Sequence, residues 1–133
     1  MKKKIFYILI FLSAECLQAQ MLKGSNWLLV SIDNLSSGKS QQVGAKAKAA
    51  LYFETDSTYS GAFCNSYSGK YSNPKEKILK LWAPVSTKMY CVGLDKVEKE
   101  LLLLFPKTDH YRLERDELFL FTTNNFRISF KKF

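Results

Sequence analysis

The chain has 133 residues, which is the length of one domain, and its composition is 47% hydrophobic and 14% aromatic. These values exclude an intrinsically disordered chain, and the length is sufficient to bury a core without metals or many disulfides. The formal net charge is +8, which is compatible with an anionic partner such as a membrane surface.

The N-terminus has the pattern of an export signal. Lysines at positions 2–4 precede an uncharged apolar run of ten residues, 5–14. This run is too short to span a bilayer core, which takes about 20 residues. We expect cleavage after Ala19, which removes residues 1–19 and leaves residues 20–133 as a single domain. An uncleaved anchor helix is the alternative.

Lipid anchoring through Cys16 is not expected. Glu15 stands where the lipoprotein signal peptidase needs a small neutral residue. We therefore expect an exported protein that is periplasmic or secreted. Export also separates the protein from nucleic acid, which excludes nucleic acid as a partner.

The positive charge of the expected mature chain is uneven. Residues 20–90 carry nine lysines and four acidic residues, whereas residues 91–133 carry eight basic and seven acidic residues. This asymmetry could favour peripheral contact with an anionic membrane surface. A solvated, lysine-rich face is the alternative.

The first half of the mature chain reads as strands separated by polar turns. Residues 27–32 and 47–53 are rich in β-favouring side chains, and residues 58–63 return as the second half of a hairpin. The polar stretch 33–44 is expected to be a loop. Gly61 inside the hairpin indicates a bulge or a close backbone approach.

Strand candidates become shorter toward the middle of the chain. Residues 70–72 and 78–82 are expected to be strands, and residues 85–94 to be a connecting segment that carries Cys91.

Residues 95–105 predict a helix that Pro106 ends. Asp95 is expected to cap the first turn, with Glu98 completing a capping box. One face is apolar, and core packing is the expected role of that face, with a partner-binding or membrane helix as the alternative. Its residues are Val97, Leu101, Leu104 and Phe105.

Three closing strands are expected at residues 110–114, 117–122 and 126–130, joined by tight turns. Residues 117–122 are apolar on both faces, which predicts a central strand. Short strands with tight turns imply antiparallel pairing. The predicted class is therefore mainly β, or α+β with a single helix covering one side.

Cys64 and Cys91 are the cysteines that remain after cleavage, and export favours a disulfide between them. Two free thiols, or a catalytic or metal-bound pair, are the alternatives. Between the cysteines, Asn65 and Gly69 suit a tight turn, in which Gly69 would adopt a conformation that other residues avoid. One interpretation is a loop that presents Asn65, Tyr67 and Tyr71 for function, and the other is a turn that only holds the disulfide.

The sequence contains no enzyme signature. His110 is the single histidine, and neither a nucleophile motif, a phosphate-binding loop nor a cluster of metal ligands accompanies it. We expect a non-enzymatic protein with no catalytic residues, metal or cofactor.

Two motifs together resemble a known family. G-A-F-C-N-S-Y-S-G-K-Y at residues 61–71 and S-T-K-M-Y-C at residues 86–91 are similar to the two signatures of the META/HslJ-like domain. The resemblance extends over about residues 25–133, with Phe63 and Tyr90 as bulkier departures. The matching signature positions, interpreted as structural, are Gly61, Cys64, Asn65, Gly69, Tyr71, Thr87, Met89 and Cys91.

The resemblance implies a barrel-like antiparallel sheet with one helix, in a family of small bacterial envelope proteins of which some are linked to stress. No catalytic residues are implied. Two functions are therefore weighed: an envelope protein that acts by protein interaction or envelope maintenance, and a binder of lipid or another small apolar ligand in the periplasm. We expect a monomer whose partner is an envelope protein or such a ligand.

Overall fold

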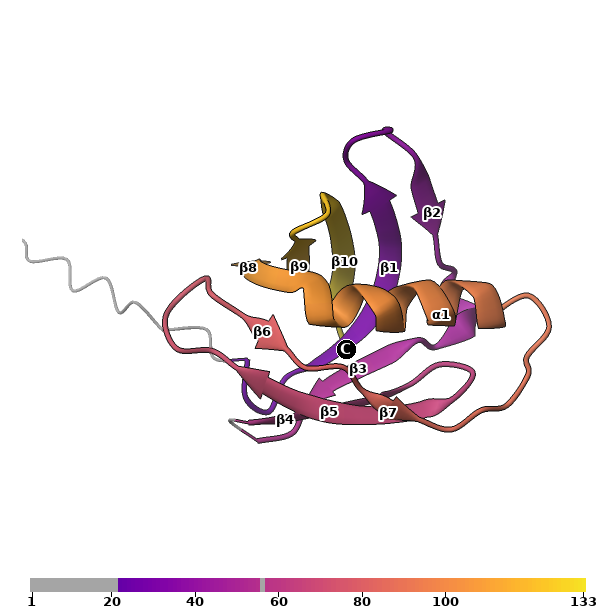
Figure 1. Ribbon diagram of the computed structural model, residues 1–133, viewed down its shortest axis with the longest axis horizontal. Helices are drawn as coiled ribbons and strands as arrows, with labels where there is room; N and C mark the ends of the chain where they lie inside the picture. Colours follow the sequence, from indigo (N-terminus) through magenta and orange to yellow (C-terminus); the bar gives the residue numbers. More distant parts are fainter. Residues whose placement is uncertain (1–21, 56) are drawn as a thin grey trace, which may run out of the picture.

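The computed structural model of the protein describes residues 22–55 and 57–133. The expected signal sequence, its cleavage site and Cys16 lie outside the described residues. The described chain forms one antiparallel sheet that curls into a nearly closed barrel, with one α-helix crossing in front of it (Figure 1). This architecture confirms the predicted mainly β class with a barrel-like sheet.

The strands are β1 (Asn26–Asn34), β2 (Ser40–Gln42), β3 (Ala50–Phe53), β4 (Thr58–Ala62), β5 (Ser66–Ser72), β6 (Lys80–Leu81), β7 (Val85–Ser86), β8 (Thr108–Glu114), β9 (Glu117–Thr122) and β10 (Phe126–Lys132). The helix is α1 (Asp95–Leu104), and two short 3-10 segments are η1 (Ala45–Ala47) and η2 (Phe105–Lys107).

The sheet follows the order β6-β5-β4-β3-β1-β10-β9-β8, while β2 pairs with β1 and β7 pairs with β5. The two ends of this order meet. The backbone N–H of Leu79 donates to the carbonyl of Asp109 at 3.2 Å, and that of Tyr111 donates to the carbonyl of Lys77 at 3.0 Å. This seam brings the β6 end of the sheet against β8 and nearly closes the barrel.

The closing strands show why the sequence forms a curved sheet with one buried face. In β9, Leu118 and Leu120 are buried, while Phe119 and Phe121, which alternate with them, are half-buried on the outer face. Because β9 lies between β8 and β10, its prediction as a central strand is confirmed. The turn before β9 is made by Arg115, which has a positive φ of 52°.

The helix packs its apolar stripe into the barrel. Leu101, Leu104 and Phe105 are buried, and the Phe105 ring lies 5.7 Å from the rings of both Tyr59 and Tyr67. The expected core-packing role of this stripe is confirmed. Among the described residues, no helix is long and apolar enough to span a membrane.

Some expected elements differ from the structure. The predicted loop 33–44 contains β2, whose three residues are polar and exposed. This strand pairs with the C-terminal half of β1. Polar residues can form β2 because the side chains on both faces of this short strand are exposed to solvent. The expected strand 70–72 begins earlier, at Ser66, and the expected strand 78–82 is reduced to β6.

Candidate functional site

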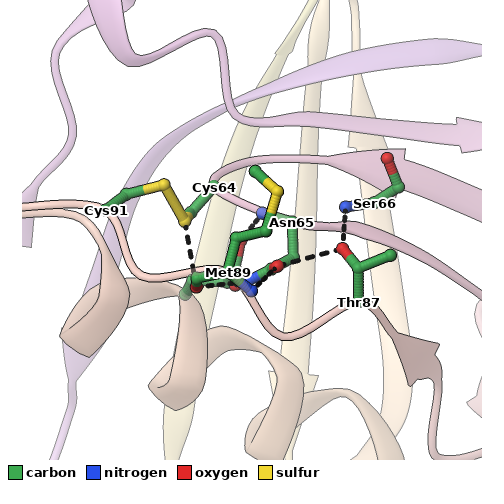
Figure 2. The surroundings of a disulfide bond; sticks show 7 residues. Cys64, Asn65, Ser66, Thr87, Met89 and Cys91 are labelled. Atoms are coloured by element: carbon green, nitrogen blue, oxygen red, sulfur yellow. Dashed lines mark hydrogen bonds between the residues drawn. A yellow bond between two sulfur atoms is a disulfide. The ribbon is translucent and has the colours of Figure 1, made fainter.

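The two predicted cysteines join distant parts of the chain. Cys64, just before β5, forms a disulfide with Cys91, just before α1, with an S–S length of 2.00 Å and a Cα–Cα distance of 5.8 Å (Figure 2). The disulfide predicted from the export signal is therefore present, and the free-thiol and metal alternatives do not apply.

Asn65, next to this disulfide, is buried and bridges three segments (Figure 2). Its side-chain oxygen accepts hydrogen bonds from the backbone N–H of Met89 at 2.6 Å and from the Thr87 hydroxyl at 2.9 Å. Its side-chain amide donates to Glu98 at 2.5 Å and to the carbonyl of Met89 at 3.2 Å. Thr87 in turn accepts from the backbone N–H of Ser66 at 3.2 Å. These bonds use the full capacity of the Asn65 side chain.

Glu98 completes the network from the helix. It is only 4% exposed, and its second carboxylate oxygen accepts from the backbone N–H of Asn65 at 2.6 Å. The predicted capping box is wrong, because Leu94 occupies the cap position, Asp95 is already helical, and no side chain caps the first turn. Glu98 turns inward because burial of the backbone N–H and amide of Asn65 requires an acceptor there.

Two signature glycines make room for tyrosine rings. A Cβ at Gly61 would lie 2.2 Å from the Tyr67 ring and 2.3 Å from the carbonyl of Ala50, and a Cβ at Gly69 would lie 2.7 Å from the Tyr59 ring. The expected close approach at Gly61 is confirmed. Gly69 does not have the positive φ expected of it, and it serves the same spacing role instead. Burial raises the pKa of both tyrosines, which keeps their hydroxyls protonated.

The interpretation in which a loop presents Asn65, Tyr67 and Tyr71 is wrong. All three are buried, since Tyr67 and Tyr71 belong to β5 and point into the core. The Tyr67 hydroxyl donates to the carbonyl of Ala50 at 2.7 Å, and the Tyr71 hydroxyl donates to the carbonyl of Thr55. The burial of these side chains was not predicted, because the polar residues after Cys64 favour a turn and give no sign that β5 already begins at Ser66.

The surface beside this network is apolar and basic. We call residues 78–92 the outer segment, which runs along β5 through β6 and β7 and ends just after Cys91. Its most exposed apolar side chains are Val85 at 78%, Tyr90 at 77% and Val92 at 85%. Met89, one of the family signature positions, also points outward, with 62% of its surface exposed. The disulfide and Asn65 therefore hold a backbone whose side chains face solvent.

Residues 20–132 match the META domain. The chain belongs to the META domain family. No curated protein shows significant sequence similarity to it.

Solved structures share the fold of this META domain. A protein from Burkholderia xenovorans, determined by NMR, aligns with a TM-score of 0.74 at 23% identity over 86% of this chain and 85% of its own. A DUF4847 family protein from Bacteroides vulgatus, determined by crystallography, aligns with a TM-score of 0.59 at 13% identity over 81% of this chain and 92% of its own. At these identities the likeness establishes the fold alone.

His110 is the other residue that the sequence singled out. In this META domain it is exposed, lies 2.6 Å from Asp109 and stacks on the Phe121 ring at 4.7 Å. Across residues 22–55 and 57–133, no group of three or more potential metal-ligating side chains is gathered. The expectations of a non-enzymatic, metal-free protein stay predictions.

Proposed function

We propose that this chain is a non-enzymatic exported protein of the cell envelope, which acts through its surface in protein interaction or envelope maintenance. One observation carries the proposal. Four of the family signature positions hold the outer segment in place, and the apolar side chains of that segment face solvent. These four are Cys64, Asn65, Thr87 and Cys91. Such an arrangement suits contact with a partner better than chemistry on a substrate.

Export and a role under envelope stress complete the proposal. The N-terminal pattern supports export, and a disulfide in the fold suits an oxidising compartment. The stress role rests on the family resemblance alone.

The alternative, a small apolar ligand inside the barrel, has less support. The rings of Tyr59, Tyr67 and Phe105 contact one another in the interior, with centroid distances of 5.7 to 6.5 Å. A ligand would have to displace these rings and leave the tyrosine hydroxyls without their partners.

Export is tested by the intact mass of protein expressed with its own N-terminus. We expect loss of residues 1–19, no lipid on Cys16, and a mass lower by two hydrogens for the disulfide. A chain that keeps residues 1–19 in the cell interior would overturn the export part of the proposal. A discrete small-molecule adduct under native conditions would favour the ligand alternative.

Surface contact is tested by photo-crosslinking in living cells. A photoreactive side chain at Tyr90 is expected to capture envelope components, whereas the same group at Leu35, an exposed residue far along the chain, is the matched control. Equal capture from both positions, or none from Tyr90, would contradict the proposal.

A further inference from the structure

Most of the exposed large apolar side chains among the described residues belong to one segment of the chain. Of the large hydrophobic residues that are exposed, most belong to the outer segment, and these are Ile78, Trp82, Val85, Met89, Tyr90 and Val92. The others are scattered at Leu35, Leu103 and Phe133. A concentration of this kind marks an interaction surface, whereas isolated exposed apolar residues need no explanation.

The charges in this part of the sequence are all positive but for one. Residues 70–92 contain five lysines and one acidic residue, Glu76, and all six are exposed. None of these lysines forms an ion pair with any other described residue. Their charges are therefore available to an external anion.

The outer segment is also held in a defined shape. Hydrogen bonds to β5 anchor its first part, since Leu81 lies opposite Tyr71 and Ser86 lies opposite Tyr67. Asn65 holds Met89, and the disulfide holds Cys91. A surface that is already ordered loses little conformational entropy when it binds.

The type of cation indicates the class of partner. Protein interfaces are enriched in arginine and depleted in lysine, but all basic residues of the expected mature chain before residue 96 are lysines. Lysines combined with aromatic and aliphatic side chains are typical of surfaces that lie on anionic lipid. Trp82, half-exposed beneath the Lys80 ammonium at 4.8 Å, shows this combination directly.

From these observations we infer that the outer segment docks peripherally on an anionic phospholipid surface, with its apolar side chains entering the interface and Lys80 and Lys88 lying among the headgroups. This inference rests on the proposed function and names the partner that the exported surface contacts.

Flotation of the mature, oxidised chain with lipid vesicles tests the inference. Vesicles of phosphatidylcholine containing phosphatidylglycerol are compared with vesicles of phosphatidylcholine alone, at physiological salt. We expect binding to the first only, with a blue shift of tryptophan emission. The shift reports Trp82, because Trp27 is buried in the core and does not change environment.

Two pairs of variants locate the contact. Lys80→Gln with Lys88→Gln should weaken binding by about fivefold per lysine. The matched control, Lys39→Gln with Lys46→Gln, removes the same charge from exposed residues outside the segment and should have little effect, because these lysines take no part in the inferred contact. Val85→Ser, Tyr90→Ser and Val92→Ser together should weaken binding at least about tenfold, whereas Leu35→Ser with Leu103→Ser should not.

Several results would overturn the inference. They are absence of binding to the anionic vesicles, equal losses from both lysine pairs, and binding that ignores the apolar variants. If Tyr90 crosslinks to an envelope protein while vesicles do not bind, the lipid inference fails and the proposed function stands. If the chain is not exported, the proposed function fails whatever the vesicles show.

Discussion

The outer face of the closing strands and the outer segment both place aromatic side chains and cations at the surface, but they use them differently. On the closing strands, the guanidinium of Arg112 lies 5.0 Å from the Phe119 ring and 5.8 Å from the Phe121 ring, and that of Arg127 lies 6.0 Å from Phe119. His110 stacks on Phe121. The aromatic rings there are covered by the protein's own cations.

Those cations are themselves neutralised within the fold. Arg112 forms an ion pair with Glu114 at 2.8 Å, and Arg127 forms one with Asp33 at 3.0 Å. In the outer segment the lysines have no such partners among the described residues, and Tyr90 and Val92 are bare. The Trp82 ring does have a cation over it, Lys80, but that lysine has no acidic partner among the described residues. The comparison teaches that an aromatic, basic composition marks a contact surface only where the fold leaves the cations without ion-pair partners.

The largest expected effect comes from removing the disulfide that holds the outer segment. Cys64→Ser with Cys91→Ser should lower the free energy of unfolding by roughly 3–4 kcal/mol, given the separation of 27 residues. Urea denaturation measures this change. The reduced wild-type chain is the control and should match the double variant. A loss of stability without any loss of vesicle binding would show that the outer segment does not need the disulfide in order to bind lipid.

Glu98→Gln should have the next largest effect, about 2 kcal/mol of destabilisation. Its carboxylate accepts bonds from both the backbone and the side-chain amide of Asn65, and a glutamine would turn its own NH₂ toward one of these donors. Glu100→Gln, two residues along the same helix and half-buried, is the control. Equal stability of the two variants in urea would contradict the role assigned to Glu98.

At the ion pair between β1 and β10, Asp33→Asn should cost about 1 kcal/mol, and it should change how stability responds to acid. Burial alone would raise the pKa of Asp33, but hydrogen bonds from Ser40 and Arg127 and the charge of Arg127 hold it below 3.8. The stabilisation is therefore complete above pH 3.8 and is lost as the pH falls through the lower, folded pKa. Urea denaturation at a series of pH values below 3.8 measures this effect. The free energy of unfolding should fall less steeply with decreasing pH for Asp33→Asn than for the control Asp116→Asn, which changes an exposed residue.

The smallest effect is expected when the half-buried rings of the closing strands are removed and vesicle binding is compared with that of the outer-segment variants. Phe119→Ser with Phe121→Ser removes two aromatic rings from the closing strands, and vesicle affinity should change by no more than about twofold. The reason is that Arg112, Arg127 and His110 already cover these rings. Flotation measures it against the variants of Val85, Tyr90 and Val92. A loss comparable to theirs would make the two regions equivalent and remove the distinction drawn between them.

The sequence predicted those parts of the fold whose signal is local. A run that is apolar on both faces revealed β9, and the tight turn and apolar residues after it revealed β10. The apolar stripe with Pro106 revealed α1, and the expected export suggested the disulfide. The β2 arm was missed because Ser40 to Gln42 have no apolar periodicity, and they pair with β1 only because the turn before them brings the backbone back.

The site was less predictable than the fold, because its central contact is non-local. Glu98 sits three positions after Asp95, so its spacing fits a capping box as well as it fits an inward-facing acceptor. Only the burial of Asn65, which is set by β5 and the segment before α1 together, decides between them. The asparagine directly after Cys64, a cysteine expected to be cross-linked, is the clue in the sequence that could have directed attention to a partner elsewhere in the chain.

The pairing of β1 with β10 has a consequence for the order of folding. Trp27 lies opposite Lys132 and Asn34 lies opposite Phe126, so the first strand of the sheet lies against the last along nearly its whole length. Contacts between such distant parts of a chain form late and slowly. The barrel therefore cannot be completed until the final strand has left the ribosome, so β1 has to wait for its partner while the rest of the chain is synthesised.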